Sequence, residues 1–539
     1  MNDWELSIWR TARRYAVPRW MIERATERRL AGDWRGACAA AHIDVDIDPA
    51  DLTPEIEDDL RHLAPDLLRW HLPRGSQQLT TVVINRVVVL ARRGADLLYV
   101  LTPPVPAGAQ RLRLGFGPPP PEAADFLRED WSGHRCLWDA RRAGGLLTLW
   151  GGDRPPFFHA DGTPLTDAEL PAGDPGPDDP VARAEWLTLR RDRDGLEKAL
   201  TDAGLDALLA RTDRAVNVGW LRVLAIDPAL FDRMVRGLRE AGVEQTCLTY
   251  QSYRFRLDTR LPHLRFLGHA SVSSPAVPSG SAPPEQTWRE LPDLALLRAG
   301  RITPEELHPL VRDALFPARP PADRPVGPPD PELPTPFRIR CRDREWHLVS
   351  LRDGRLDMPH TAEEQRREQA VVALGGTTTG CFAAQEAWAN GRKRPPRALR
   401  AFRRELLLRF QHGDAPGVTR LLDAGLGPHF RDGLGRGPLH LLHLVDHEEL
   451  LPRLLAAGLD VDAADRDGWT PLFTAVTEGG SERYVRALLE AGARTDTVDR
   501  QGRTLATMIH HRRRTDLRFL HEKVRRDHPH LPRHRGEPD

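Results

Sequence analysis

The sequence contains almost no lysine and carries no net charge. Lysine occurs only at Lys198, Lys393 and Lys523, so nearly all of the 77 basic residues are arginine, and 77 acidic residues balance them. A zero formal charge removes the long-range field that drives non-specific binding to nucleic acids or anionic lipids. Either partner would need a local basic patch. We therefore expect no membrane partner and consider nucleic-acid binding an unfavoured alternative.

Cysteine is also scarce and irregularly spaced. No two of the five cysteines form a C-x-x-C motif; they are Cys38, Cys136, Cys247, Cys341 and Cys381. This spacing indicates neither a disulfide framework nor a zinc ribbon, and it fits a reducing compartment. The N-terminus lacks the apolar core of a signal peptide, and no run approaches the roughly 18–20 apolar residues of a membrane span. We predict a cytoplasmic location.

Familiar catalytic motifs are missing as well. The sequence has no G-x-x-x-x-G-K-[ST] phosphate loop, no H-E-x-x-H metal motif and no G-x-S-x-G nucleophile turn. Each of these motifs places a specific side chain or backbone donor at the reacting group. Their absence predicts no cofactor and no catalytic residue, and it favours a protein that is not an enzyme.

Proline and glycine gather in three segments that lack the apolar spacing of packed elements. These segments, 171–180, 272–286 and 318–336, are predicted linkers. The multidomain division is then an α+β domain at 1–170, a mixed α/β block at 181–271, a short helical segment at 287–317, a small β-meander plus helices at 337–396, repeats at 397–531 and a tail at 532–539.

The N-terminal region shows both helical and strand patterns. A helix is predicted where apolar residues recur at spacings of three and four, at Trp4, Ile8, Ala12 and Tyr15. A hairpin is predicted where the β-branched run 79–91 and the apolar run 97–101 flank a glycine-containing turn. Two further strand-like runs, 111–116 and 146–150, complete the α+β prediction.

The final third of the chain repeats itself. LLDAG at Leu421–Gly425 recurs as LLAAG at Leu454–Gly458 and as LLEAG at Leu488–Gly492. A turn recurs in step with it, as GRGPLH, GWTPLF and GRTLAT, beginning at Gly435, Gly468 and Gly502. Both markers therefore return every 33 or 34 residues.

This pattern resembles the ankyrin repeat, whose unit of about 33 residues carries a turn, a T-P-L-H-like helix start and a second helix that ends on glycine. Pro471 suits the first helical turn and Thr470 is placed to cap it. The glycine after each second helix suits a left-handed C-cap. The resemblance implies an all-α solenoid with β-hairpin fingers over residues 397–531, in about four units, with atypical terminal units acting as caps.

The resemblance also implies a function and a binding surface. Ankyrin proteins similar to this one bind protein partners through the finger tips and the inner helix face. Trp469 occupies the variable finger position, and Arg436 and Arg503 stand at the equivalent positions of the neighbouring units. Tryptophan and arginine contribute most when a partner desolvates them. These three residues are the predicted partner-binding positions, although Trp469 could instead pack locally against the next hairpin.

No metal site is predicted, although one acidic segment has a spacing that partly matches a calcium-binding loop. In His42–Asp48 the polar residues alternate with apolar ones, and the spacing from Asp44 to Glu55 reproduces the acidic positions of a calcium loop. Pro49 replaces the glycine that the sharp turn of such a loop needs. Asp44, Asp46, Asp48 and Glu55 are therefore only weak metal candidates, and a half-buried strand is the alternative.

Three functional hypotheses follow. The favoured one is an intracellular interaction protein that uses the ankyrin stack as its binding surface. The alternatives are an enzyme of unknown chemistry in residues 1–271 with the stack as a targeting module, and nucleic-acid binding by the arginine- and tryptophan-rich N-terminus. The whole chain, poor in lysine and rich in arginine, is also similar to uncharacterised ankyrin-repeat proteins of high-GC bacteria, a similarity that carries no activity.

Overall fold

The chain folds into two compact units. The computed structural model describes residues 1–75, 80–209, 218–251, 253–260, 262–269, 282–341, 345–390 and 394–532. The first unit comprises Met1–Pro106 and Arg111–Pro329, and the second comprises Ala107–Gln110 and Asp330–Asp539. The division at residue 329 falls inside the predicted linker 318–336. Most of the predicted linker 272–286 and of the predicted tail 532–539 lies outside the described residues.

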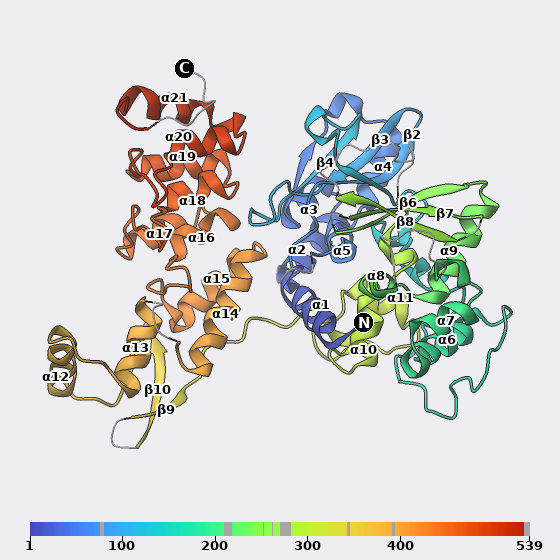
Figure 1. The fold of residues 1–539 in the computed structure, drawn as a ribbon, viewed down its shortest axis with the longest axis horizontal. Coiled ribbons are helices and arrows are strands. Elements are labelled where there is room, and N and C mark those ends of the chain that lie inside the picture. The colour runs from blue at the N-terminus through green and yellow to red at the C-terminus, as the bar shows by residue number, and fades with distance from the viewer. Residues whose placement is uncertain are drawn as a thin grey trace. The chain divides into compact units, whose positions relative to one another are not determined.

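The first unit mixes helices and strands (Figure 1). Its helices are α1 (Asp3–Tyr15), α2 (Arg19–Leu30), α3 (Trp34–Ala40), α4 (Pro54–His62), α5 (Pro65–His71), α6 (Pro180–Asp194), α7 (Leu196–Asp202), α8 (Val218–Val223), α9 (Pro228–Glu240), α10 (Pro292–Arg298) and α11 (Pro309–Leu315). Its strands are β1 (Ile43–Asp46), β2 (Arg86–Arg93), β3 (Asp96–Leu101), β4 (Leu112–Gly117), β5 (Leu127–Asp130), β6 (Gln245–Tyr250), β7 (Tyr253–Asp258) and β8 (His263–His269).

A five-stranded sheet of order β1-β4-β3-β2-β5 forms the centre of the N-terminal region. The predicted hairpin is confirmed as β2 and β3, which pair antiparallel around Gly94, whose φ is +61°. Alternate residues of β2 enter different cores, because side chains of a strand point to opposite faces. Val88 and Leu90 join the main core, whereas Val87 and Val89 pack in a smaller cluster.

The prediction of a strand at 146–150 was wrong. Residues Ala143–Leu149 form a 3-10 helix instead. Leu146, Leu147 and Leu149 are buried in the main core. Among the described residues no strand pairs with this segment, and Gly144 and Gly145 favour a tight turn over an extended strand.

The mixed block 181–271 builds a second core. Its antiparallel sheet, of order β6-β7-β8, packs with α6, α7 and α9 around Leu200, Phe231 and Phe255. Trp288, from the predicted short helical segment, is fully buried in the same core. Nearby, Ala282 pairs with Glu129 as an isolated bridge. The described end of the predicted linker 272–286 therefore lies against β5, the edge strand of the five-stranded sheet.

One buried ion pair shows why residues 287–317 fold with the N-terminal region. Asp293 at the start of α10 accepts hydrogen bonds from Arg13 Nε (2.5 Å) and from Trp70 Nε1 (3.1 Å). Arg13 also donates to the carbonyl of Trp70 at 2.8 Å. Asp293 is fully buried, so its charge depends on these donors. Helices α1, α5 and α10 thus meet at one polar contact inside the apolar core.

The second unit contains three short strands followed by helices. The strands are β9 (Phe337–Arg340), β10 (Trp346–Arg352) and β11 (Arg355–Asp357), and the helices are α12 (Ala362–Ala373), α13 (Gly380–Asn390), α14 (Arg397–Gln411), α15 (Ala415–Leu421), α16 (Pro438–Leu441), α17 (Leu450–Ala456), α18 (Pro471–Thr477), α19 (Glu482–Glu490), α20 (Leu505–His511) and α21 (Arg518–Asp527). The predicted β-meander is confirmed as an antiparallel sheet of order β11-β10-β9.

Helices α14–α21 form four stacked pairs within residues 394–532 (Figure 1). The helix starts follow the sequence pattern, because Thr470 Oγ1 accepts a hydrogen bond from the N–H of Phe473, and Thr504 caps α20 in the same way. The glycines that end the second helices have the left-handed conformation expected of a C-cap, with φ of +81° at Gly458 and +90° at Gly492.

The small sheet covers the open end of this stack. Gly354, in the turn after β10, donates a backbone hydrogen bond to Gly425 at 3.0 Å. The ring of Trp388 from α13 lies 6.4 Å from that of Phe430. Ile339, Val349, Leu351 and Leu356 of the sheet belong to the same core as the first helix pair. Residues 337–390 are thus a cap on the repeats, in one unit with them.

The Arg13 contact yields a stability prediction. Replacing Arg13 with methionine leaves the buried Asp293 carboxylate without its guanidinium partner, so we expect the free energy of unfolding to fall by about 3–5 kcal/mol. Chemical denaturation of the full chain, followed by tryptophan fluorescence, measures this change.

Arg301→Met is the matched control, because Arg301 pairs with Asp3 of the same helix α1 at the surface, where the side chains are 49% and 88% exposed. We expect a change within about 1 kcal/mol for this variant. Equal effects of the two substitutions would contradict the structural role given to Arg13.

Candidate protein-interaction surface

Three loops between successive helix pairs share one hydrogen-bonded design, and we call them the fingers: residues 432–437, 465–470 and 499–504. Each begins with an aspartate whose carboxylate accepts hydrogen bonds from the backbone N–H groups two and four residues later. These distances are 2.8 and 2.9 Å for Asp432, 2.8 and 2.9 Å for Asp465, and 2.9 and 2.8 Å for Asp499. One buried side chain therefore fixes the path of each finger.

The backbone closes each finger and joins it to the next. The N–H of Asp465 donates to the carbonyl of Trp469 at 2.9 Å, and Gly468 turns the chain with a φ of +82° that a residue with a Cβ rarely adopts. The N–H of Arg466 donates to Leu434, and that of Arg500 donates to Asp467, at 2.9 and 3.0 Å. The three fingers consequently form one connected row.

His440 adds a side-chain link between two fingers. Its Nδ1 accepts a hydrogen bond from the N–H of Gly437 at 3.2 Å, and its Nε2 lies 3.0 Å from the carbonyl of Trp469. This pattern requires the neutral ring with its proton on Nε2. Burial lowers the pKa of His440 to about 4, which keeps the ring neutral near pH 7. His440 thus has a structural role.

The structure places the three predicted partner-binding residues on these fingers and gives each an intramolecular contact. Arg436 Nε donates to Asp432 at 2.9 Å, and Arg503 Nε donates to Asp499 at 2.7 Å. Trp469 is half-buried, with Arg503 over its ring at 5.9 Å. Its ring centroid also lies 5.6 Å from that of Phe473, so part of the residue packs locally.

Other side chains of the fingers and their flanks reach further into solvent. Leu434 is 50% exposed and Val498 is 40% exposed. Arg466 and Arg500 are exposed at equivalent positions of the second and third fingers. The sequence pattern did not single out these four residues because they occupy variable positions next to the repeat markers.

The acidic metal candidates are not brought together. Asp44 lies on the edge strand β1 and accepts a hydrogen bond from Arg111 at 2.5 Å. Asp48 accepts from the N–H of Ala50 at 2.9 Å, Asp46 is exposed at the end of β1, and Glu55 stands in the first turn of α4. The segment is therefore a strand followed by a turn, and its carboxylates point to different partners.

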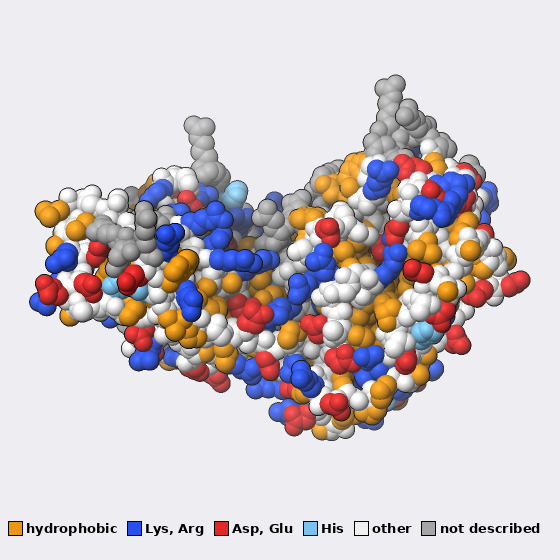
Figure 2. All heavy atoms as spheres, turned by 90° about the horizontal axis from the view of Figure 1, so that it is seen from below, with side chains coloured by type: hydrophobic (Ala, Val, Ile, Leu, Met, Phe, Trp, Pro, Cys, Tyr) orange, Lys and Arg blue, Asp and Glu red, His pale blue; other side chains and the backbone are white. Residues whose placement is uncertain are grey.

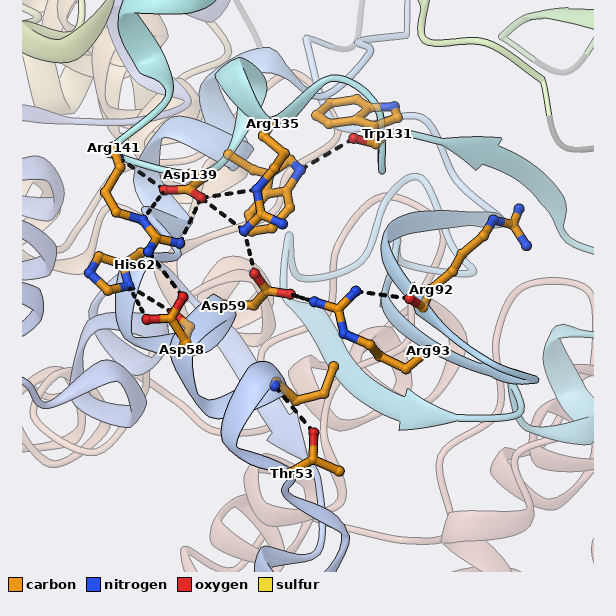
Figure 3. Close-up of polar contacts among 12 residues, drawn as sticks. Thr53, Asp58, Asp59, His62, Arg92, Arg93, Trp131, Arg135, Asp139 and Arg141 are labelled. Carbon is orange, nitrogen blue, oxygen red and sulfur yellow. Dashed lines mark hydrogen bonds and ion pairs between the residues drawn. The ribbon is translucent and has the colours of Figure 1, made fainter. Parts of the chain in front are cut away.

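The densest ionic cluster of the first unit surrounds α4. Figure 3 shows Asp59 between Arg93 and Arg135, and Asp139 between Arg135 and Arg141. Burial favours a raised pKa for Asp139, but hydrogen bonds from Arg141 and Arg135 outweigh it and lower the pKa. Since each buried carboxylate has arginine partners, this cluster is suited to holding α4 against β2 and the 135–141 segment.

The enzyme hypothesis requires a pocket in which titratable groups converge. His71, Glu285 and Arg289 do line a cavity, but its volume is about 20 Å³. That is space for roughly one water molecule. Burial lowers the pKa of His71 to about 4, so this imidazole is neutral near pH 7. This cavity is too small to hold an organic substrate. A larger hollow of about 770 Å³ in the same unit is lined by Asp161, Glu305 and Arg319, among others, and has the volume that a small organic molecule would need.

The N-terminal tryptophans do not form a continuous stacking surface. Trp34 is buried, Trp9 and Trp20 are half-buried, and Trp4 is 53% exposed. The three covered rings have arginine side chains of this chain over them: Arg13 over Trp9, Arg24 over Trp20 and Arg35 over Trp34. On the face drawn in Figure 2, basic and acidic side chains are interspersed. The arrangement gives single-stranded nucleic acid no aromatic platform of the usual kind.

A cluster of cysteine and histidine side chains escaped the sequence prediction. Cys341, His347, His360 and Cys381 have side-chain ligand atoms that all lie within 4.8 Å of one another. Among the described residues this is the group able to hold a metal ion. The available signal was the gathering of two of the five cysteines and two histidines within 41 residues, without any standard spacing.

Comparison with known proteins identifies the repeats. A family profile described as ankyrin repeats, three copies, matches residues 406–499. This match includes the fingers at 432–437 and 465–470, and it ends at Asp499, where the third finger begins. The C-terminal unit therefore contains ankyrin repeats, and the pair α20–α21 extends the stack beyond the matched residues.

Curated proteins are similar to short segments of the chain. The chain is 39% identical over 72 residues to human transient receptor potential cation channel subfamily A member 1, which covers 13% of this chain and 6% of that protein. It is 34% identical over 83 residues to the probable 26S proteasome regulatory subunit p28 of Saccharomyces cerevisiae, covering 15% and 36%. An ankyrin repeat-containing protein of Schizosaccharomyces pombe is 39% identical over 56 residues, covering 10% and 27%. The chain matches only a minor part of each relative.

No helix among the described residues combines the length and the apolar character that crossing a bilayer requires.

The finger design predicts a strong effect of its aspartates. Asp499→Ala removes the carboxylate that accepts from two backbone N–H groups and from Arg503, so we expect the free energy of unfolding to fall by about 1.5–3 kcal/mol. Urea denaturation monitored by circular dichroism measures it. Asp496→Ala is the control, since Asp496 only pairs with the exposed Arg494. A comparable loss in both variants would argue against the aspartate as the organiser of the finger.

His440 predicts a pH dependence. Its pKa is near its ordinary value of 6.5 in the unfolded chain and about 4 in the folded protein, so protonation favours unfolding. Its contribution is present above pH 6.5 and is lost as the pH falls toward 4, by up to about 3 kcal/mol.

The difference in unfolding free energy between the wild type and His440→Gln isolates this contribution, because all other histidines are common to both proteins. We expect the difference to shrink between pH 7 and pH 4.5. A constant difference across this range would contradict a buried, neutral His440.

Proposed function

We propose that this chain is a protein-interaction protein whose ankyrin stack is the binding surface. The observation that carries the proposal is the row of three fingers, each fixed by a buried aspartate and each presenting exposed side chains in register. Ankyrin repeats generally mediate protein–protein interaction, which supports the same conclusion.

The rigidity of the fingers favours tight binding. A partner that docks on a flexible loop must order it, at a cost of about 0.5–1.5 kcal/mol for each immobilised side chain. Here Arg436 and Arg503 are already held by Asp432 and Asp499, in bonds of 2.9 and 2.7 Å. The guanidinium groups therefore meet a partner in a fixed orientation, with much of their charge neutralised.

Trp469 is the residue that we place at the centre of the contact. It lies on the middle finger between the other two, and its half-buried ring keeps part of its surface for a partner. The exposed Leu434 and Arg466 stand nearby on the same row. A large aromatic ring surrounded by arginine and aliphatic side chains has the composition of an interface hot spot.

We also propose a cytoplasmic location and a high-GC bacterial origin for the chain. Five free thiols, four of them buried, are suited to a reducing compartment. The near absence of lysine beside many arginines supports the bacterial origin. Both statements belong to the proposal.

The proposal predicts that capture of partners depends on Trp469. Immobilised full-length chain is incubated with lysate of the source cell, and enriched proteins are quantified by mass spectrometry. Trp469→Ala is expected to reduce the capture of the specific partners at least tenfold, because a hot-spot residue contributes about 2 kcal/mol or more.

Two controls make the result interpretable. Trp4→Ala removes a tryptophan that is 53% exposed in the other unit and should leave capture unchanged. Trp469→Phe keeps an aromatic ring against Phe473 and reports whether the finger is still folded, by its thermal midpoint. Undiminished capture by a folded Trp469→Ala protein would contradict the finger surface as the binding site.

A further inference from the structure

Four potential metal ligands come from four separate places in the cap of the stack. Cys341 follows β9, His347 lies in β10, His360 precedes α12, and Cys381 stands in the first turn of α13. Cys381 is fully buried and the other three side chains are half-buried. The hairpin β9–β10 and the start of α13 thus bring together residues up to 40 positions apart in the sequence.

Three of the distances between the ligand atoms are close to the edges of a tetrahedral site, and all four atoms lie within 4.8 Å of one another. Cys341 Sγ lies 3.4 Å from His360 Nε2, His347 Nδ1 lies 3.1 Å from His360 Nε2, and Cys381 Sγ lies 3.7 Å from His347 Nδ1. A zinc tetrahedron with bonds of about 2.3 Å to sulfur and 2.0–2.1 Å to nitrogen has edges of roughly 3.3–3.8 Å. The side chains are therefore spaced closely enough to share one ion.

We propose that Cys341, His347, His360 and Cys381 bind one zinc ion as a structural site. Two sulfur and two nitrogen ligands in a tetrahedron are typical of zinc, and four protein ligands leave no open position for a reacting water. On binding, both thiols release their protons to solvent. Two thiolates then neutralise the charge of the ion, which suits a largely buried position.

A carboxylate stands behind one of the ligands. His360 faces the cluster with Nε2, and its other nitrogen, Nδ1, lies 3.6 Å from Glu364 Oε2 on α12. A carboxylate beside the outer nitrogen of a metal-bound histidine orients the ring and increases its basicity. Glu364 therefore has the position of an outer-shell partner, and a small rotation would complete the hydrogen bond.

Gly380 lets the helix approach the hairpin. A Cβ built on Gly380 would lie 2.6 Å from Cys341 Sγ and 2.9 Å from Cys341 Cα, and φ of this residue is +57°. Any side chain at this position would push Cys341 and Cys381 apart. The glycine before the second cysteine ligand is thus required for the four atoms to converge.

The proposed ion would link the strands β9 and β10 of the cap to its helix α13. Strands β9, β10 and β11 have only four, seven and three residues, which is little structure to support an independent fold. Small modules of this size commonly need a metal or disulfide. Because the same residues cover the first helix pair, zinc would support the end of the ankyrin stack that lacks a preceding repeat.

The first test measures the metal in the full-length chain. Protein purified without chelator is analysed by inductively coupled plasma mass spectrometry, and chelated protein is reloaded with Zn²⁺ or Co²⁺ alone. We expect about one zinc per chain, a tetrahedral thiolate spectrum with Co²⁺, and a lower thermal midpoint of the chelated chain that Zn²⁺ restores.

Substitutions locate the ion. The double variant Cys341→Ser with Cys381→Ser should lose the zinc, whereas Cys247→Ser, which removes a buried free thiol of the other unit, should keep it. Chain that takes up neither Zn²⁺ nor Co²⁺ with reduced thiols, or that joins the two cysteines in a disulfide, overturns the proposal. Retention of zinc by the double variant also overturns it, because the ion would then lie elsewhere in the chain.

A glycine pair tests the geometry without removing a ligand. Gly380→Ala should weaken zinc binding at least tenfold in competition with a chromophoric chelator, because the methyl group crowds Cys341. Gly375→Ala is matched, since Gly375 also has a positive φ, of +81°, but has open space around its Cβ position. Equal zinc affinity in the two variants would contradict the proposed convergence.

Discussion

Buried ion pairs between arginine and carboxylate groups stabilise the interior of each of the two units. Asp293 binds Arg13 in the first core, Glu129 of β5 lies 3.0 Å from Arg86 of the neighbouring strand β2, and Arg409 in α14 reaches Asp414 at 2.7 Å. Each partner in these pairs is almost completely buried, so removing one member leaves an uncompensated charge. The chain has 77 basic and 77 acidic residues, and some of these opposite charges are thus paired inside the two units.

The fingers use the same chemistry nearer the surface. An aspartate at each finger base binds backbone N–H groups, and in the outer fingers it also binds the arginine four residues later. The aspartate therefore fixes the path of the finger backbone, and in the outer fingers it also holds the arginine side chain and its charge in place. This explains how arginine-rich loops can project from the stack in one fixed conformation, as a binding surface requires.

The repeats could be predicted from the sequence because their markers are local. The turn of each finger and the ends of each helix are set mainly by residues within one period. Leu421–Gly425 and its two later copies therefore suffice to predict the repeat. The N-terminal core depends on contacts such as Arg13 with Asp293, which are 280 residues apart and leave no local pattern. The Cys341–Cys381 cluster was missed for the same reason, since only the hairpin and Gly380 bring its members together. The exposed finger residues occupy variable positions of the repeat, so only the structure shows which of them face solvent.

In the C-terminal unit the cap covers one end of the helix stack, and the three fingers form an exposed row along it. If a partner contacts this row, it shields the fingers from solvent. Hydrogen–deuterium exchange of the full-length chain, alone and with a captured partner, measures this shielding. We expect partner-induced protection to be concentrated in residues 432–437, 465–470 and 499–504. Protection confined to residues 1–329, with unchanged exchange in the three fingers, would contradict it.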